Sequence, residues 1–134
     1  MKLIEVPIAP GELIDKLTIL RLKSERIADP AKLANVTHEM TVLGKVADAT
    51  LPGDEGLMAL WSQLYDINAA LWEIEDDIRA CEARQDFGTE FIRLARAVYR
   101  TNDRRAEVKK AINLRLGSAI VEEKSYVSPD GPAP

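Results

Sequence analysis

The sequence predicts an all-α protein, an elongated antiparallel four-helix bundle built on a long helical hairpin. The first observation is an apolar repeat through residues 57–81 that alternates steps of three and four, which is typical of a helix packed along a seam. The second is the placement of proline and glycine, which divides the chain into four helical stretches. The third is a composition of 46% hydrophobic and 30% charged residues in 134, which suits one folded domain.

The first element expected is a short strand. Residues 2–8 alternate between two faces in the manner of a strand, and Pro7, which lacks a backbone donor, restricts that strand to a sheet edge. A first helix is then expected from residue 10 to residue 28. Pro10 suits the first turn of this helix because its fixed backbone angle is already helical.

The dipeptide Asp29-Pro30 separates the first helix from the second. A residue before proline avoids the helical region, so the first helix should end there. Aspartate caps a helix start and proline suits its first turn, so a second helix is expected over residues 30–49. The proline and glycine of residues 50–54 then break the helical pattern.

Two long helices should follow as an antiparallel hairpin. The apolar repeat lies in a helix expected over residues 54–85, which would extend about 48 Å at 1.5 Å per residue. A tight turn at residues 86–88 leads into a fourth helix over residues 89–116. Gly117 stands at the position where a left-handed residue commonly ends a helix.

The end of the chain contains a second candidate strand and a tail. Residues 119–127 are the candidate strand, which could lie beside the first one. The last segment, residues 128–134, is rich in proline and glycine and is predicted to be disordered. The sequence therefore predicts one helical domain over residues 1–127, followed by a disordered C-terminal tail.

The two long helices carry opposite charge. Residues 54–85 hold eight acidic and two basic side chains, whereas residues 91–115 hold eight basic and two acidic ones. If the hairpin turns near residue 86, Asp77 should lie by Arg96 and Glu73 by Arg100. Such pairs contribute little singly, but they would oppose a shift in the register of the hairpin.

One stretch of the fourth helix departs from the apolar pattern. Thr101, Asn102 and Arg105 occupy positions that continue the seam, so polar groups enter the core there. The hairpin pairing sets Asn68 and Trp72 opposite them. Buried polar groups need partners, so this region is either a structural network that fixes helix pairing or a pocket that holds a small anion.

The residues proposed for such a ligand site are Asp15, Lys16, Asn102 and Arg105. No catalytic residue can be assigned, and no metal or cofactor is expected. His38 is the only histidine, so neither a carboxylate di-iron centre nor a histidine-based triad with a matching nucleophile motif fits the sequence. Glycine-rich phosphate loops are missing as well.

The net charge of the chain and the lengths of its helices indicate which partners to expect. The net charge of −4 disfavours nonspecific binding to nucleic acid. No apolar stretch is long enough to span a bilayer, and no signal peptide is recognisable, so we expect a cytoplasmic protein. The first two helices are too short to cover the long hairpin, and the apolar surface left over favours a homodimer, with a further protein partner possible.

Five short segments carry a family resemblance: residues 11–20 (GELIDKLTIL), 74–79 (IEDDIR), 102–106 (NDRRA), 112–113 (IN) and 122–126 (EEKSY). Through them nearly the whole chain resembles an uncharacterised bacterial family of short helical proteins, a domain of unknown function. The resemblance implies a complete single domain and no mechanism.

Two functions are therefore carried forward. The first is a non-enzymatic interaction or scaffold protein that acts as a homodimer through its helical surfaces. The alternative is a small-molecule (anion) binding protein or an enzyme that uses the polar cluster between the first, third and fourth helices. A closed seam at that cluster would favour the first function, and a concave pocket lined by the four proposed residues would favour the second.

Overall fold

The computed structural model describes residues 1–131 and contains four helices, whose boundaries all lie within two residues of the predicted ones. These helices are α1 (Pro10–Arg26), α2 (Pro30–Thr50), α3 (Glu55–Ala83) and α4 (Thr89–Arg115). The all-α prediction is confirmed.

Side chains at the helix ends explain why the helices begin and end where they do. The carboxylate of Asp29 accepts a hydrogen bond from the backbone N–H of Lys32 at 2.9 Å and caps α2. Asp54 caps α3 in the same way by accepting from the N–H of Leu57 at 3.2 Å. After α4, Gly117 adopts a φ of 65°, a left-handed conformation that glycine tolerates at low cost.

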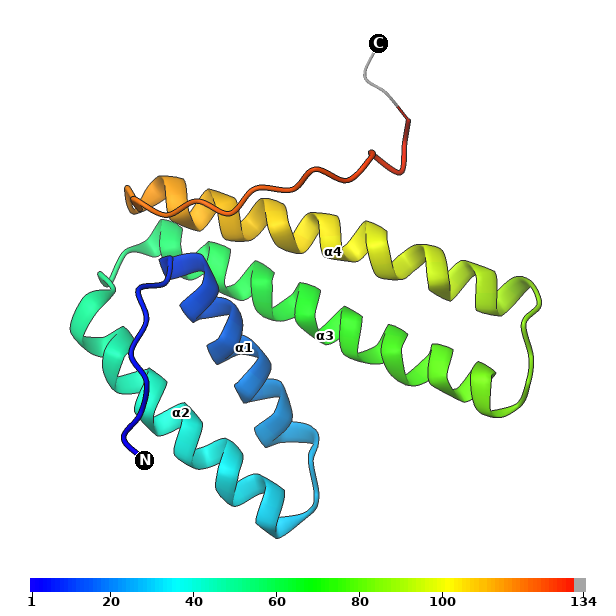
Figure 1. Cartoon of the computed structure of the whole chain (residues 1–134), viewed down its shortest axis with the longest axis horizontal. Coiled ribbons are helices and arrows are strands. Elements are labelled where there is room, and N and C mark those ends of the chain that lie inside the picture. Colours follow the sequence, from blue (N-terminus) through cyan, green and yellow to red (C-terminus); the bar gives the residue numbers. More distant parts are fainter. Residues whose placement is uncertain (132–134) are drawn as a thin grey trace.

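The four helices form two hairpins of unequal length. α3 and α4 run antiparallel side by side, and α1 packs against one end of this long hairpin (Figure 1). α2 folds back along α1 and contacts no other helix of the described chain. The far end of the long hairpin therefore extends beyond the cover of α1 and α2.

The core lies where α1, the start of α3 and the end of α4 meet. Ile14, Leu57, Leu64 and Ile112 form it, each with an exposed fraction of 0%. Leu60 and Trp61 pack against this cluster from α3. The N-terminal part of the seam predicted within residues 57–81 thus lies in the core of the protein.

The predicted terminal strands are wrong. Residues 2–8 and 119–127 contain no strand, and residues 1–131 contain none elsewhere. The N-terminal segment lies on the side of α1 and α2, whereas the C-terminal segment follows α4 (Figure 1). A strand needs a neighbour for its backbone hydrogen bonds, and these two segments are not placed to supply one another.

The predicted ion pairs across the long hairpin are also wrong. Glu73 pairs with Arg26 of α1, and Arg100 pairs with Asp130 beyond α4. Asp77 forms no ion pair within the described residues. One ion pair does cross the hairpin, at its open end, where Arg115 of α4 pairs with Asp54, the residue before α3, at 2.5 Å.

The predicted tail lies partly outside the described residues, which end at residue 131. Residues 128–131 form a turn closed by a hydrogen bond from the Gly131 N–H to the Ser128 carbonyl at 3.1 Å. The prediction of disorder for residues 132–134 falls outside the described part. Within that part, no helix is long and apolar enough to cross a membrane.

Candidate functional site

The polar stretch of α4 meets a row of small and polar residues on α1. Gly11, Asp15 and Thr18 recur at steps of four and three, so they share one face of the helix. All three are buried. Polar groups at these positions must find partners inside the protein, because burial without hydrogen bonds costs free energy.

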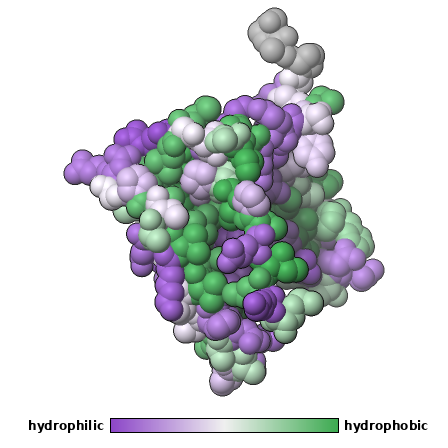
Figure 2. All heavy atoms as spheres, turned by 60° about the vertical axis from the view of Figure 1, so that its left-hand side comes forward, coloured by the Kyte–Doolittle hydropathy of each residue, from purple (hydrophilic) through white to green (hydrophobic). Residues whose placement is uncertain are grey.

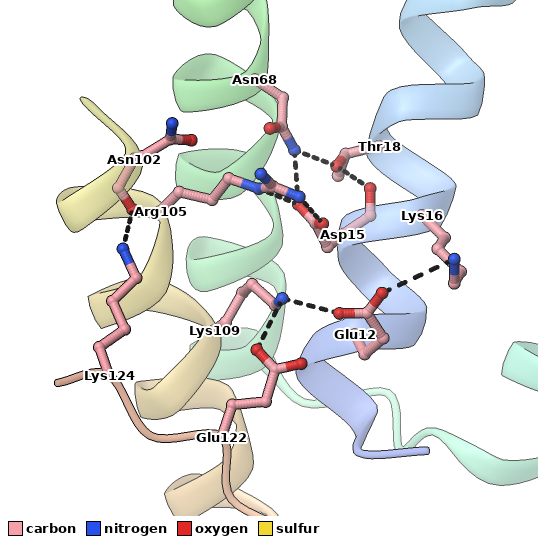
Figure 3. Close-up of polar contacts among 10 residues, drawn as sticks. All are labelled: Glu12, Asp15, Lys16, Thr18, Asn68, Asn102, Arg105, Lys109, Glu122 and Lys124. Atoms are coloured by element: carbon pink, nitrogen blue, oxygen red, sulfur yellow. Dashed lines mark hydrogen bonds and ion pairs between the residues drawn. The ribbon is translucent and has the colours of Figure 1, made fainter. Parts of the chain in front are cut away.

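Asp15 is the centre of this cluster, with an exposed fraction of 1%. Arg105 of α4 binds the Asp15 carboxylate in a bidentate manner: Nε donates to Oδ1 at 2.9 Å and Nη2 donates to Oδ2. Asn68 of α3 donates through Nδ2 to Asp15 Oδ1 and to Thr18 Oγ1, both at 2.9 Å. Side chains of α3 and α4 therefore converge on one carboxylate of α1 (Figure 3).

The electrostatics of this pair favour the charged forms. Burial raises the pKa of Asp15, but hydrogen bonds from Arg105 and Asn68 outweigh it and hold the pKa below its usual range. The hydrogen bond to Asp15 raises the pKa of Arg105. The cluster is thus an ion pair at neutral pH, and neither group is poised to exchange a proton.

A second ionic group lies one turn away. Lys109 of α4 donates to Glu12 of α1 at 2.7 Å and to Glu122 of the C-terminal segment at 3.0 Å. The Lys109 side chain is 12% exposed, whereas that of Glu122 is 58% exposed. The hydrogen bond from Lys109 lowers the pKa of Glu12. This group ties the C-terminal segment to both α1 and α4.

The backbones of α1 and α4 come into close contact near the start of α1 and the end of α4. The backbone N–H of Gly11 donates to Oδ1 of Asn113 at 2.7 Å. A Cβ atom at residue 11 would lie 2.5 Å from the carbonyl oxygen of Lys109 and 2.8 Å from Asn113 Oδ1. Only glycine fits at this position without a shift of the helices.

The structure brings together two of the four proposed site residues. Asp15 and Arg105 are bonded directly, and Asn102 lies one turn before Arg105 on α4. The side chain of Lys16 is 48% exposed and pairs with Glu12 at 3.6 Å, on the outside of α1 (Figure 3). Lys16 is therefore no part of the Asp15 cluster.

Sequence reasoning missed several members of the site. These are Glu12, Thr18, Lys109, Asn113 and Glu122. The spacing of Gly11, Asp15 and Thr18 on one helix face was an available signal. Asn68 was placed opposite Arg105 by the hairpin pairing, and both residues do meet, with the carboxylate of Asp15 between them.

Arg105 and Asn102 line two hollows. One has a volume of about 450 Å³ and lies between α1, α3 and α4, where Asn68 and Trp72 also line it, as the hairpin pairing predicted. The other has a volume of about 660 Å³ and lies between α4 and the C-terminal segment. The side-chain amide of Asn102 forms no hydrogen bond with the described residues.

The polar side chains of this site bond mainly to one another, across α1, α3 and α4. Every buried side-chain nitrogen and oxygen of the described residues has a hydrogen-bond partner. The same residues contain no group of three side chains placed to hold a metal ion. The cations Arg105 and Lys109 already face buried or half-buried carboxylates, so the cluster has little net charge to offer a ligand.

Comparison with known proteins gives one match. The model of the Family of unknown function (DUF6165) matches residues 4–134. Neither the curated proteins nor the solved structures include a match. Four of the five segments noted in the sequence, all but residues 74–79, contribute residues to the Asp15 and Lys109 groups or to the Gly11–Asn113 contact.

Proposed function

The chain belongs to the family of unknown function DUF6165, and with no activity to carry over from it, we propose a non-enzymatic interaction protein that acts as a homodimer through α2. In this account the Asp15 cluster is a structural joint. It fixes the angle at which the α1–α2 hairpin leaves the α3–α4 hairpin, and so presents α2 to a second copy.

The observation that supports this proposal is the isolation of α2. Of its 21 residues only Val36 and Ala47 are buried. It contacts α1 and no other described helix. Helices of this length in water owe most of their stability to packing, so a helix supported on one side is incomplete by itself.

The surface next to α2 offers apolar side chains for a second copy. Val46 of α2 is 46% exposed and Met58, at the start of α3, is 48% exposed. Hydrophobic side chains gather on this side of the molecule among hydrophilic ones (Figure 2). Two α1–α2 hairpins related by a twofold axis would form a four-helix arrangement that buries these side chains.

The test is sedimentation equilibrium of the wild type and of Val42→Lys/Val46→Lys at micromolar concentration. The wild type should have about twice the chain mass of 14.9 kDa, and the double variant should have the chain mass itself. Val46 is exposed and Val42 is partly exposed, so lysines there would be solvated in the monomer and desolvated in the dimer, which weakens association.

The control is Ile92→Lys, which places one charge at an apolar residue of α4 that is 55% exposed and far from α2. This variant should remain a dimer. A wild-type mass equal to one chain would contradict the proposal. Dissociation by Ile92→Lys but not by the α2 variant would move the interface to the far end of the long hairpin.

One observation favours the second candidate function, the binding of a small anion. The hollow of about 450 Å³ is lined by Arg105 and by Asn102, whose side-chain amide has no partner in the described chain. The test is the melting temperature with phosphate or succinate at constant ionic strength. We expect no shift; a rise in the wild type that is lost in Arg105→Met would favour the anion site over the homodimer scaffold.

A further inference from the structure

The C-terminal segment, residues 118–131, is fastened to α4 by ion pairs. It leaves the end of α4 and runs back along that helix in an extended form (Figure 1). Four pairs hold it: Glu122 to Lys109 at 3.0 Å, Glu123 to Lys110 at 3.2 Å, Lys124 to Asp103 at 3.3 Å and Asp130 to Arg100 at 2.9 Å.

Apolar contacts contribute little to this attachment. Three of the four large apolar side chains of the segment are exposed, at 45% for Ile120, 83% for Tyr126 and 87% for Val127, and the fourth, Val121, is partly buried. Ion pairs at the surface are each weak and are screened by salt. The segment is therefore held mainly by charge complementarity.

The segment also fits its groove loosely. A hollow of about 660 Å³ remains between it and α4, lined on the helix side by Tyr99, Asn102 and Ala106 together with the charged Asp103, Arg105 and Lys109. A peptide that carried a bulky apolar side chain beside its acidic residues would fill this space and keep the ionic contacts. The chain's own segment is thus a weak occupant of the surface beneath it.

We propose that the side of α4 that carries Arg100 and Lys110, with Lys109 at its edge, is a docking surface for an extended acidic peptide of a partner protein, which the C-terminal segment occupies in cis. The inference rests on the proposed role as an interaction protein and adds the kind of partner. It predicts that the surface becomes available when the segment is displaced.

The charges under the segment favour a peptide over nucleic acid. Asp103 lies among the basic residues and pairs with Lys124. The surface is therefore complementary to an acidic peptide that also carries one basic side chain. Glu12 already neutralises part of the charge of Lys109. A polyphosphate would have to face both carboxylates, and its affinity depends on unpaired cations.

The experiment measures the fluorescence anisotropy of a labelled peptide with the sequence of residues 118–131. It is titrated with the full-length wild type and with Glu122→Lys/Glu123→Lys, in which two of the four pairs are reversed and the segment is repelled from α4. We expect the released variant to bind the peptide about tenfold more tightly than the wild type, and to lose most of this affinity at about 0.5 M salt.

Two controls make the result specific. Asp76→Lys/Asp77→Lys changes the net charge equally on an exposed part of α3, and should bind the peptide as weakly as the wild type. Adding Arg100→Glu/Lys110→Glu to the released variant should abolish binding, and both of these side chains are exposed enough, at 41% and 45%, to be replaced without loss of folding.

Equal binding by the wild type and the released variant would overturn the cis occupancy. No binding by the released variant would overturn the docking surface itself, and so would displacement of the peptide by a single-stranded oligonucleotide at equal concentration. Sedimentation equilibrium tests the homodimer separately, because the released variant should keep the mass of the wild type. If the peptide does not bind but the protein has the mass of a dimer, only the docking surface fails. If the protein has the mass of one chain, the proposed homodimer fails.

Discussion

Arg105→Met lowers the free energy of unfolding by about 3 to 5 kcal/mol, since it leaves a buried carboxylate without its cation. Asp15 is 1% exposed and keeps only the hydrogen bond from Asn68 in this variant. Methionine is of similar length, so lost packing is a small part of the effect. Urea unfolding at a fixed protomer concentration, followed by circular dichroism, measures the difference.

The pH dependence identifies Asp15 as the cause. In the wild type the pKa of Asp15 is held below its usual range, so its contribution to stability is complete above the unfolded value of about 3.9 and is lost only as the pH falls below that. In Arg105→Met burial should raise the pKa above the unfolded value. The deficit of the variant should therefore be largest at pH 7 and narrow as the pH falls towards 5.

Asp15→Asn in the same background is the matched control. Asparagine keeps the shape and can still accept from Asn68, so Asp15→Asn/Arg105→Met should recover part of the stability that Arg105→Met loses. A loss below about 1 kcal/mol in Arg105→Met, or a deficit independent of pH, would contradict the role of this ion pair as a buried joint.

Gly11→Ala should destabilise the protein by about 3 kcal/mol, because the added Cβ overpacks the contact of α1 with α4 and weakens a buried hydrogen bond. The new atom would lie 2.5 Å from the backbone oxygen of Lys109, which cannot move without shifting α4. The measurement is the same urea unfolding experiment.

Gly44→Ala provides a control of opposite sign. Gly44 lies within α2, and a Cβ atom there meets nothing within 4 Å. Alanine in place of glycine inside a helix should add about 0.5 to 1 kcal/mol. If both substitutions stabilise the protein, α1 and α4 are further apart than the structure places them.

Helix positions were predictable from the sequence because local chemistry determines them. Proline at residue 30, the aspartate before it and Gly117 act on the backbone within one turn, and the predicted ends agree with the structure to within two residues. The strand predicted for residues 2–8 is wrong because alternation is only half of the requirement. The other half is a neighbouring strand, and no local pattern can place one.

The site was predictable only in part for a similar reason. Arg105 occupies a seam position of α4, and a buried cation needs a carboxylate such as Asp15 as its partner. Lys16 is one residue further on and therefore about 100° around the helix, on the outer side. Glu122 was not predictable, because its partner Lys109 is reached by an extended segment that carries no periodic pattern.

The ion pairs expected between α3 and α4 show the effect of competing partners. Pairing along a hairpin assumes that the two helices have no other neighbours. Arg26 of α1 reaches Glu73, and Asp130 of the C-terminal segment reaches Arg100. Exposed pairs are weak, so a long side chain takes whichever partner lies nearest, and sequence spacing alone cannot tell which.

Hydrogen exchange of the α2 amides at two protein concentrations tests most directly whether a second copy covers α2. The protein is labelled at about 1 µM and at about 100 µM, a range that changes dimer occupancy by mass action. We predict that the amides of α2 exchange more slowly at the higher concentration, while those of α3 around Leu64, buried within one chain, stay equally protected at both. Exchange in α2 that is fast and independent of concentration would contradict the homodimer.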